Sequence, residues 1–178
     1  MGTLPLIDPA TATGKTADLL AAVQRGLGVV PNMTKAMANA PALLEGYLAL
    51  SAALSKGTLK AATRERLALA VAQGNACDYC LSAHSYLAEH AAALSADDIA
   101  AAREGDNDDP KIAALLTFAV AVNTTRGSVS ADDLAAVRAA GAGDEEIAEV
   151  IGHVGLNVLT NYFNKAAAVD IDFPVVTA

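Results

Sequence analysis

The only two cysteines of the chain lie in one short segment, in the order Cys77-Asp-Tyr-Cys80. Glu65 lies twelve residues before the first cysteine, and His84 lies four residues after the second. Two thiols at this spacing can close a disulfide and reopen it, while a neighbouring acid–base pair can move the protons. The segment therefore predicts redox chemistry and not a structural cross-link.

A helix over residues 75–94 is expected to carry the cysteines, with Asn75 as its N-cap. On such a helix Cys77 lies in the first turn, where unpaired backbone N–H groups favour a thiolate. His84 lies one turn beyond Cys80, about 40° round the helix, and can act as its base. These residues alone leave the nucleophile open, because the helix terminus favours Cys77 and the histidine favours Cys80.

Glu65 is expected on the preceding helix, over residues 61–73. If that helix packs antiparallel to the next, Glu65 comes within one helical turn of His84. It would then orient His84 and raise its basicity in a Glu–His–Cys relay. Two other interpretations stay open: an exposed or ion-paired role for Glu65 in the charged run 64–66, and a hydrogen-bonded core position for His84.

A cofactor or metal is not expected. Cys-x-x-Cys is half of many zinc sites, but a second such pair is absent and His90 lies about 120° from His84 round the helix. A c-type haem is excluded because Leu81, and not histidine, follows Cys80. No nicotinamide or flavin motif is present. Zinc binding through Cys77 and Cys80, or inert buried cysteines, stay as alternatives.

The rest of the chain predicts an all-α fold of about eight helices. Alanine, the strongest helix former, is the most frequent apolar residue, and aromatic residues make up only 4%. Capping signatures at Ser95-Ala-Asp-Asp98 and Ser130-Ala-Asp-Asp133 each open a short helix that a glycine closes. We predict a single domain over residues 1–178, with residues 1–14 as an irregular arm. The other predicted helices cover residues 15–27, 32–39, 41–56, 61–73, 75–94, 110–125 and a last helix capped by Asp144.

Two features of the last third of the chain are less specific. His153, Asn157 and Asn161 form a polar strip on an otherwise apolar helix, for which we favour core or subunit-interface hydrogen bonds over catalysis. The tail over residues 169–176 is short, apolar and extended, which makes it a candidate for packing on a neighbouring subunit.

Charge and hydropathy exclude several classes of protein. The formal net charge of −8 leaves no basic patch for nucleic acid or for an anionic membrane surface. The N-terminus lacks the pattern of a secretory signal, and the longest uncharged run, residues 150–164, is too short and polar to cross a bilayer. A cytoplasmic location is expected, where a lone Cys-x-x-Cys is more often catalytic or metal-binding than structural.

The chain resembles the alkylhydroperoxidase D family (AhpD) within the carboxymuconolactone decarboxylase superfamily. The resemblance is carried by Glu65 and by the pattern Asn75-x-Cys77-x-x-Cys80-x-x-x-His84. Weaker likeness, to the peroxidase-related subgroup, extends over most of the chain. It includes Val30-Pro-Asn-Met33, Asn161-Tyr-Phe-Asn164 and Asp172-Phe-Pro174.

The resemblance implies a helical enzyme that reduces hydroperoxides. Cys80 would be the peroxidatic cysteine and Cys77 the resolving one, with Glu65 and His84 as the proton relay. It also implies a lipoyl- or thioredoxin-like dithiol protein as reductant, and a homo-oligomer, either trimer or hexamer. Tyr79 departs from relatives that carry a relay histidine before the second cysteine. The alternatives are thiol–disulfide exchange or redox sensing without strong peroxidase activity, and a zinc-binding module.

Overall fold

The computed structural model describes residues 2–178, which form nine α-helices and no strand, so the predicted all-α fold is confirmed. In chain order the helices are α1 (Gly14–Leu27), α2 (Asn32–Met37), α3 (Pro41–Leu54), α4 (Ala61–Gly74), α5 (Asp78–His90), α6 (Ala96–Arg103), α7 (Pro110–Thr124), α8 (Ala131–Ala139) and α9 (Asp144–Ala166). None of these helices is both long and apolar enough to span a bilayer.

The helix ends follow local rules. Both predicted serine caps are present, because Ser95 and Ser130 each form a reciprocal capping box with the aspartate three residues on. The start of α9 differs by one residue from the prediction. Gly143 is the N-cap, and its N–H donates to the carboxylate of Glu146 at 3.0 Å, so Asp144 is the first helical residue and not the cap.

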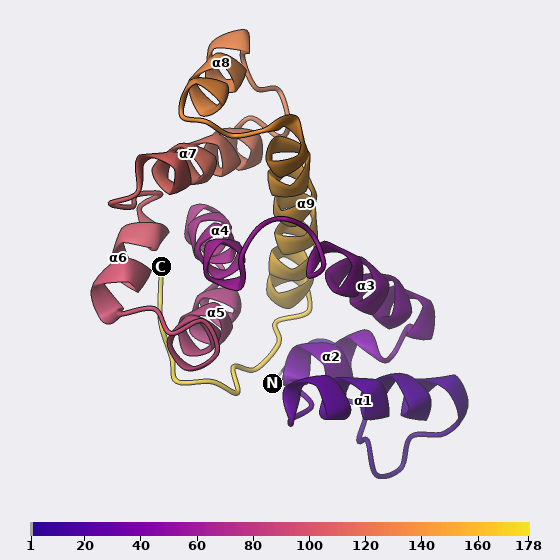
Figure 1. Cartoon of the computed structure of the whole chain (residues 1–178). Helices are drawn as coiled ribbons and strands as arrows, with labels where there is room; N and C mark the ends of the chain where they lie inside the picture. The colour runs from indigo at the N-terminus through magenta and orange to yellow at the C-terminus, as the bar shows by residue number, and fades with distance from the viewer. Residues whose placement is uncertain (1) are drawn as a thin grey trace.

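Helix α4 lies at the centre of the molecule and packs against α5, α6, α7 and α9 (Figure 1). Every residue from Arg66 to Ala72 is buried, as expected for a helix that is surrounded on all sides. One end of this arrangement is fixed by Arg66, whose guanidinium donates to Asp98 on α6 at 2.6 Å. Hydrogen bonds from Ser95 and Arg66 hold the pKa of Asp98 at about 2.

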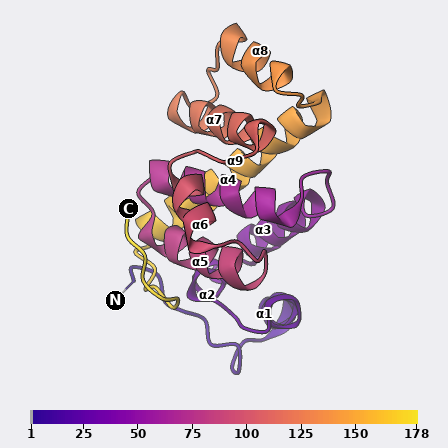
Figure 2. The same cartoon turned by 60° about the vertical axis from the view of Figure 1, so that its left-hand side comes forward.

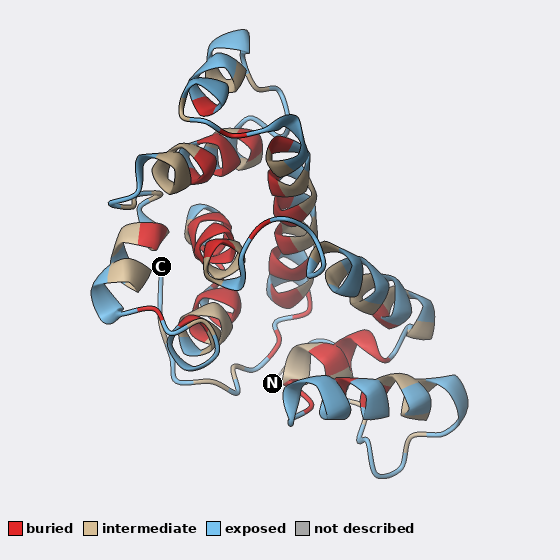
Figure 3. Ribbon diagram, in the orientation of Figure 1, coloured by how far each residue is buried: buried red, intermediate tan, exposed pale blue. Residues whose placement is uncertain are grey.

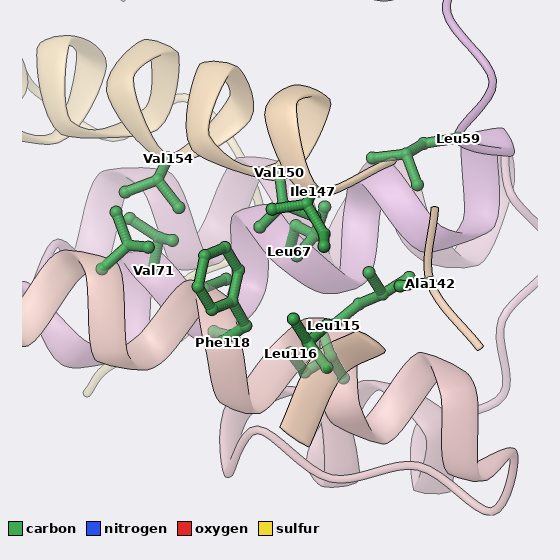
Figure 4. Close-up of a cluster of buried hydrophobic side chains, with 14 residues drawn as sticks. Leu59, Leu67, Val71, Leu115, Leu116, Phe118, Ala142, Ile147, Val150 and Val154 are labelled. Atoms are coloured by element: carbon green, nitrogen blue, oxygen red, sulfur yellow. The ribbon is translucent and has the colours of Figure 1, made fainter. Parts of the chain in front are cut away.

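The largest hydrophobic cluster joins α4, α7 and α9. Leu67, Phe118 and Val150 meet at its centre, each at most 2% exposed (Figure 4). The buried faces of these three helices point toward one another, while α8 and the outer side of α1 are largely exposed (Figure 3). A second cluster surrounds the cysteines, and a third joins α1, α2 and α3. Helices α1 and α8 lie at opposite ends of the molecule (Figure 2).

The C-terminal tail folds back onto its own chain. It passes along α5 toward α6 (Figure 1), where the N–H of Val176 donates to Ser82 Oγ at 2.9 Å. Arg103 on α6 donates to the carbonyl of Thr177 at 2.7 Å. The tail therefore contacts α5 and α6 of its own chain, while its packing on a neighbouring subunit stays a prediction.

Candidate functional site

The cysteines lie where α4 ends and α5 begins, but the boundary differs from the prediction. Asn75 caps the C-terminus of α4, since its N–H donates to the carbonyl of Val71 at 3.0 Å. The chain reverses at Ala76, whose φ is 48°, and Cys77 is the N-cap of α5. The prediction that Asn75 caps this helix and that Cys77 lies in its first turn was wrong by two residues. The helix also ends earlier than predicted, at His90.

Side-chain amides, one of them fully buried, fix the loop before Cys77. Asn75 Nδ2 donates to Asn161 Oδ1 at 2.9 Å, and Asn123 Nδ2 donates to Asn75 Oδ1 at 3.1 Å. Lys165 donates to the carbonyl of Asn75 at 2.6 Å. Helices α7 and α9 therefore hold this turn from two sides, and the core hydrogen bonding predicted for Asn161 is confirmed.

Cys77 and Cys80 form a disulfide, with their Cα atoms 5.3 Å apart. Both are buried, at 1% and 2% exposed. The N–H of Cys80 donates to Cys77 Sγ at 3.3 Å, so the N-cap sulfur receives a hydrogen bond from the first turn of α5. The pair therefore has the geometry of a dithiol–disulfide couple at a helix N-terminus.

Glu65 and His84 are in contact across the α4–α5 pair. His84 Nδ1 lies 2.8 Å from Glu65 Oε2, and both side chains are only about a quarter exposed, at 23% and 22%. The predicted meeting of these two residues is confirmed by this distance, whereas their roles in catalysis stay predictions. Glu65 fixes the orientation of the imidazole, which leaves Nε2 as the nitrogen free of this bond.

An apolar cavity of about 340 Å³ reaches Cys80. His84 lies in the same wall, and the remaining lining comes from α1, α2, α3, α5, α9, the loop between α1 and α2, and the tail. Most of it is aliphatic or aromatic, including Leu27, Val29, Leu48, Tyr47, Tyr86, Leu87 and Phe173. Such a lining suits a small molecule with an apolar body, and the cysteine and histidine provide its reactive end.

A second cavity, of about 210 Å³, also borders His84, and its lining includes the polar side chains of Glu65 and His153. His153 is only 5% exposed. Burial, followed by the nearby Arg64 guanidinium, lowers the pKa of His153, although Glu149 and Glu65 act in the opposite sense. His153 is therefore a neutral imidazole near neutral pH, while His84 borders both the apolar and the polar cavity.

Tyr79, the residue that departs from the pattern of some relatives, holds α5 to α2 and to the tail. Its hydroxyl donates to Asp172 Oδ1 at 2.8 Å and accepts from the N–H of Met33 at 3.1 Å. Burial, together with the neighbouring Asp172 carboxylate, raises the pKa of Tyr79 far above its usual range. The phenol stays protonated and connects α5 to α2 and to the tail, so it does not replace a relay histidine.

Asn164 was not predicted as a site residue, yet it contacts the sulfur of Cys80. Its Nδ2 lies 3.3 Å from Cys80 Sγ and 3.3 Å from Met33 Sδ, and its side chain is 3% exposed. A signal was available in the sequence, since Asn157, Asn161 and Asn164 follow a spacing of four and three residues on one helix face.

A metal centre has no support in the side-chain arrangement. Within residues 2–178, no group of three or more histidine, cysteine, aspartate and glutamate side chains is placed to hold a metal ion.

Comparison with known proteins agrees with the fold. The sequence model of the Carboxymuconolactone decarboxylase family matches residues 41–106, which contain α4, the cysteine loop and α5. The chain is similar to the alkylhydroperoxidase AhpD core of an uncharacterized peroxidase-related protein from Ralstonia eutropha JMP134. The two are 24% identical, the match covers 96% of this chain and 92% of that one, and the TM-score is 0.84.

Two further structures have the same fold. An uncharacterized peroxidase-related protein from Silicibacter sp. TM1040 is 24% identical over 94% of this chain and 88% of its own, with a TM-score of 0.81. The debrominase Bmp8, in complex with 2,3,4-tribromopyrrole, is 18% identical over 96% of this chain and 91% of its own, with a TM-score of 0.80. No curated protein matches the chain. The family match and the shared fold confirm the predicted resemblance to the AhpD-like carboxymuconolactone decarboxylase superfamily.

Proposed function

We propose that this chain, which has the fold of the AhpD-like carboxymuconolactone decarboxylase superfamily, is a thiol-dependent hydroperoxide reductase. The observation that carries the proposal is the Cys77–Cys80 disulfide, with Cys80 in the wall of an apolar cavity beside His84. A reversible dithiol, a base held by a carboxylate and a chamber for an apolar molecule are the parts that reduction of an organic hydroperoxide needs.

In the oxidative half of the reaction His84 accepts the thiol proton of Cys80. The Cys80 thiolate attacks the terminal oxygen of the hydroperoxide, so that an S–O bond forms and the O–O bond breaks. The departing alkoxide takes the proton from His84 and leaves as an alcohol, and Glu65 keeps the imidazole oriented throughout. Cys77 then attacks the sulfenic acid at Cys80 Sγ, and hydroxide leaves with the Cys77 proton as water.

The position of the apolar cavity supports this division of roles. Cys80 lines this cavity, whereas Cys77, the N-cap of α5, is not among its lining residues. A hydroperoxide in the cavity would therefore meet Cys80 first. This favours Cys80, the cysteine next to His84, as the nucleophile, a choice that the sequence left open.

A dithiol partner supplies the electrons for the reductive half, and its first thiolate attacks Cys80 Sγ from the cavity. Cys77 leaves as a thiolate, which the N–H of Cys80 can stabilise. The second thiol of the partner then releases Cys80 and closes the partner's own disulfide. Because both sulfurs are at most 2% exposed, a slender lipoyl arm fits this approach better than a cysteine on a folded thioredoxin-like surface.

The location and assembly of the protein follow from the same proposal. We place it in the cytoplasm, where reduced dithiol partners are maintained. The superfamily resemblance implies a trimer or hexamer, and exposed apolar side chains such as Leu50, Ile151 and Tyr162 offer surface for such contacts.

The test follows the free thiols of the reduced protein by mass spectrometry, before and after one equivalent of cumene hydroperoxide. We expect two thiols to be lost to the Cys77–Cys80 disulfide and restored by dihydrolipoamide. Cys80→Ser should abolish turnover, while Cys77→Ser should consume one equivalent and stop at a sulfenic acid. A disulfide that cycles with dithiols but consumes no hydroperoxide would replace the proposal with thiol–disulfide exchange. Undiminished turnover in Cys80→Ser would refute it.

Reductive debromination is a second candidate, favoured by the aromatic lining of the cavity and by the similarity to Bmp8. The Cys80 thiolate would take the bromine from carbon, and the carbanion would take a proton from His84. Cys77 would then displace bromide and close the disulfide, so that the two thiols supply both electrons. Bromide release from 2,3,4-tribromopyrrole, measured beside cumene hydroperoxide consumption, separates the two substrates.

A further inference from the structure

Asn164 is placed against the sulfur that the proposed reaction uses. It reaches Cys80 from α9, a separate helix whose residue 164 lies 84 positions along the chain from the cysteine. Within residues 2–178, it is the side chain that donates a hydrogen bond to Cys80 Sγ. The N–H of Cys80 itself points to Cys77 Sγ, so the first turn of α5 serves the other sulfur.

The orientation of the Asn164 amide is set by a second sulfur. An amide nitrogen carries two protons, and here one points to Cys80 Sγ and the other to Met33 Sδ, each at 3.3 Å. Met33 is held in turn by its N–H, which donates to the anchored hydroxyl of Tyr79. The nitrogen of Asn164 therefore faces the sulfurs in a fixed arrangement.

This orientation leaves the oxygen of the same amide without a hydrogen bond. Asn164 Oδ1 is buried and has no hydrogen-bond partner, and leaving a buried acceptor unpaired is unfavourable. A leucine at this position would avoid that cost while filling a similar volume. A buried amide with one unsatisfied end and the other on a redox-active sulfur points to a chemical role for the donor end.

We propose that Asn164 is a catalytic residue that stabilises the thiolate of reduced Cys80 by donating its Nδ2–H to Sγ. This assignment rests on the proposed function only in taking Cys80 as the nucleophile. When the disulfide opens, the sulfur gains a negative charge next to a donor already in place, and hydrogen bonds to a charged acceptor are roughly twice as strong as neutral ones. Asn164 thus gives Cys80 Sγ a hydrogen-bond donor, as the first turn of α5 does for Cys77 Sγ.

The test measures the Cys80 thiolate directly, in a Cys77→Ser background with one titratable thiol. Ultraviolet absorbance of the thiolate is followed against pH, together with the rate of alkylation by iodoacetamide at neutral pH. Asn164→Leu should raise the midpoint of thiolate formation by about one pH unit or more and slow alkylation about tenfold. Asn164→Asp, nearly identical in shape, replaces the donor with a carboxylate that also repels the thiolate, so it should shift the midpoint in the same direction and by more.

Two further variants separate this role from packing. Asn157→Leu removes another buried amide of α9, one that donates to the carbonyl of His153 on its own helix and to no sulfur, so it should leave the midpoint unchanged. Met33→Leu frees the amide to rotate and should raise the midpoint by less than Asn164→Leu does.

The outcomes keep the two proposals apart. An unchanged midpoint in folded Asn164→Leu and Asn164→Asp would overturn the assignment, even if the wild-type protein reduces cumene hydroperoxide. A raised midpoint in both variants would support it, even if the wild-type protein consumes no hydroperoxide and the proposed function fails.

Discussion

The two halves of α9 bury different kinds of side chain, apolar in the first half and polar in the second. Its first half contributes Ile147, Val150 and Val154 to the hydrophobic cluster with α4 and α7 (Figure 4). Its second half buries polar side chains to a similar degree, none more than 6% exposed. These are Asn157, Thr160, Asn161 and Asn164, while the buried His153 lies at the boundary between the two halves.

The two halves also differ in whether their buried polar atoms have hydrogen-bond partners. His153 Nε2, Asn161 Nδ2 and Asn164 Oδ1 are buried without a hydrogen-bond partner, and each such atom costs about 1–3 kcal/mol. The two asparagines lie on the second half, which meets the cysteines, and His153 lies at the boundary, beside the cavity that Glu65 and His84 line. The first half therefore stabilises the fold, whereas the second half gives up stability to place polar groups beside Cys80.

The largest effect should come from the acid–base pair that faces the polar half. His84→Gln removes the proposed base and should lower kcat/KM for cumene hydroperoxide by about 10²- to 10⁴-fold. Glu65→Gln keeps a hydrogen-bonding side chain and should cost less. Both side chains are partly exposed, so the urea midpoint should change little. A loss of activity that only followed a loss of folding would remove the distinction between the two halves.

The next effect belongs to the apolar half. Ile147→Ala, at a position that is 5% exposed, should lower the free energy of unfolding by about 2–5 kcal/mol, because it leaves a cavity in the main cluster. Urea denaturation measures this directly. The midpoint of Cys80 thiolate formation in the folded variant should match that of the wild type, and a shifted midpoint would mean that the halves are coupled.

The free energy of unfolding should depend on pH through His153, which lies at the boundary between the halves. The pKa of buried His153 is lowered from its ordinary value of 6.5, so below about pH 6.5 the unfolded chain binds more protons than the folded one. The free energy of unfolding should therefore fall as the pH drops from about 7.5 to about 5.5. His153→Gln should flatten this dependence in urea titrations, while His90→Gln, at an exposed position, should not. Equal slopes for wild type and His153→Gln would contradict the neutral assignment.

The smallest effect is expected at Thr160, a polar residue of the second half whose hydroxyl donates to the carbonyl of Asn157 on its own helix at 3.0 Å. Thr160→Val keeps the shape and loses only this local bond, so the stability should change by less than about 1 kcal/mol. The thiolate midpoint of Cys80 should stay constant. A shift as large as that of Asn164→Leu would show that general polarity, and not contact with sulfur, matters here.

Local features of the fold were accessible from sequence. The capping boxes at Ser95 and Ser130 depend on residues three apart, and the meeting of Glu65 with His84 follows from one turn between two packed helices. The boundary at Asn75 was missed because asparagine is favoured both at helix N-caps and at helix ends. Its role was settled by Asn123 and Asn161, which are distant in the sequence.

The contacts that complete the site could not be predicted for the same reason. Asn164 reads as one more polar residue on a long helix until α9 is packed against α5. Tyr79 connects α5 to the tail only because Asp172, 93 residues later, accepts a hydrogen bond from its hydroxyl. Periodicity indicates which helix faces are buried, but it does not identify the partner that a buried polar group meets.

The tyrosines in the walls of the apolar cavity should also report on the state of the disulfide through their intrinsic fluorescence. The chain has no tryptophan and four tyrosines, three of which, Tyr47, Tyr79 and Tyr86, line the cavity that contains Cys80. Disulfides quench nearby tyrosine emission, so opening the Cys77–Cys80 bond should brighten the intrinsic fluorescence. Turnover and ligand entry can then be followed in real time on the unlabelled protein, with the exposed Tyr162 as a constant background.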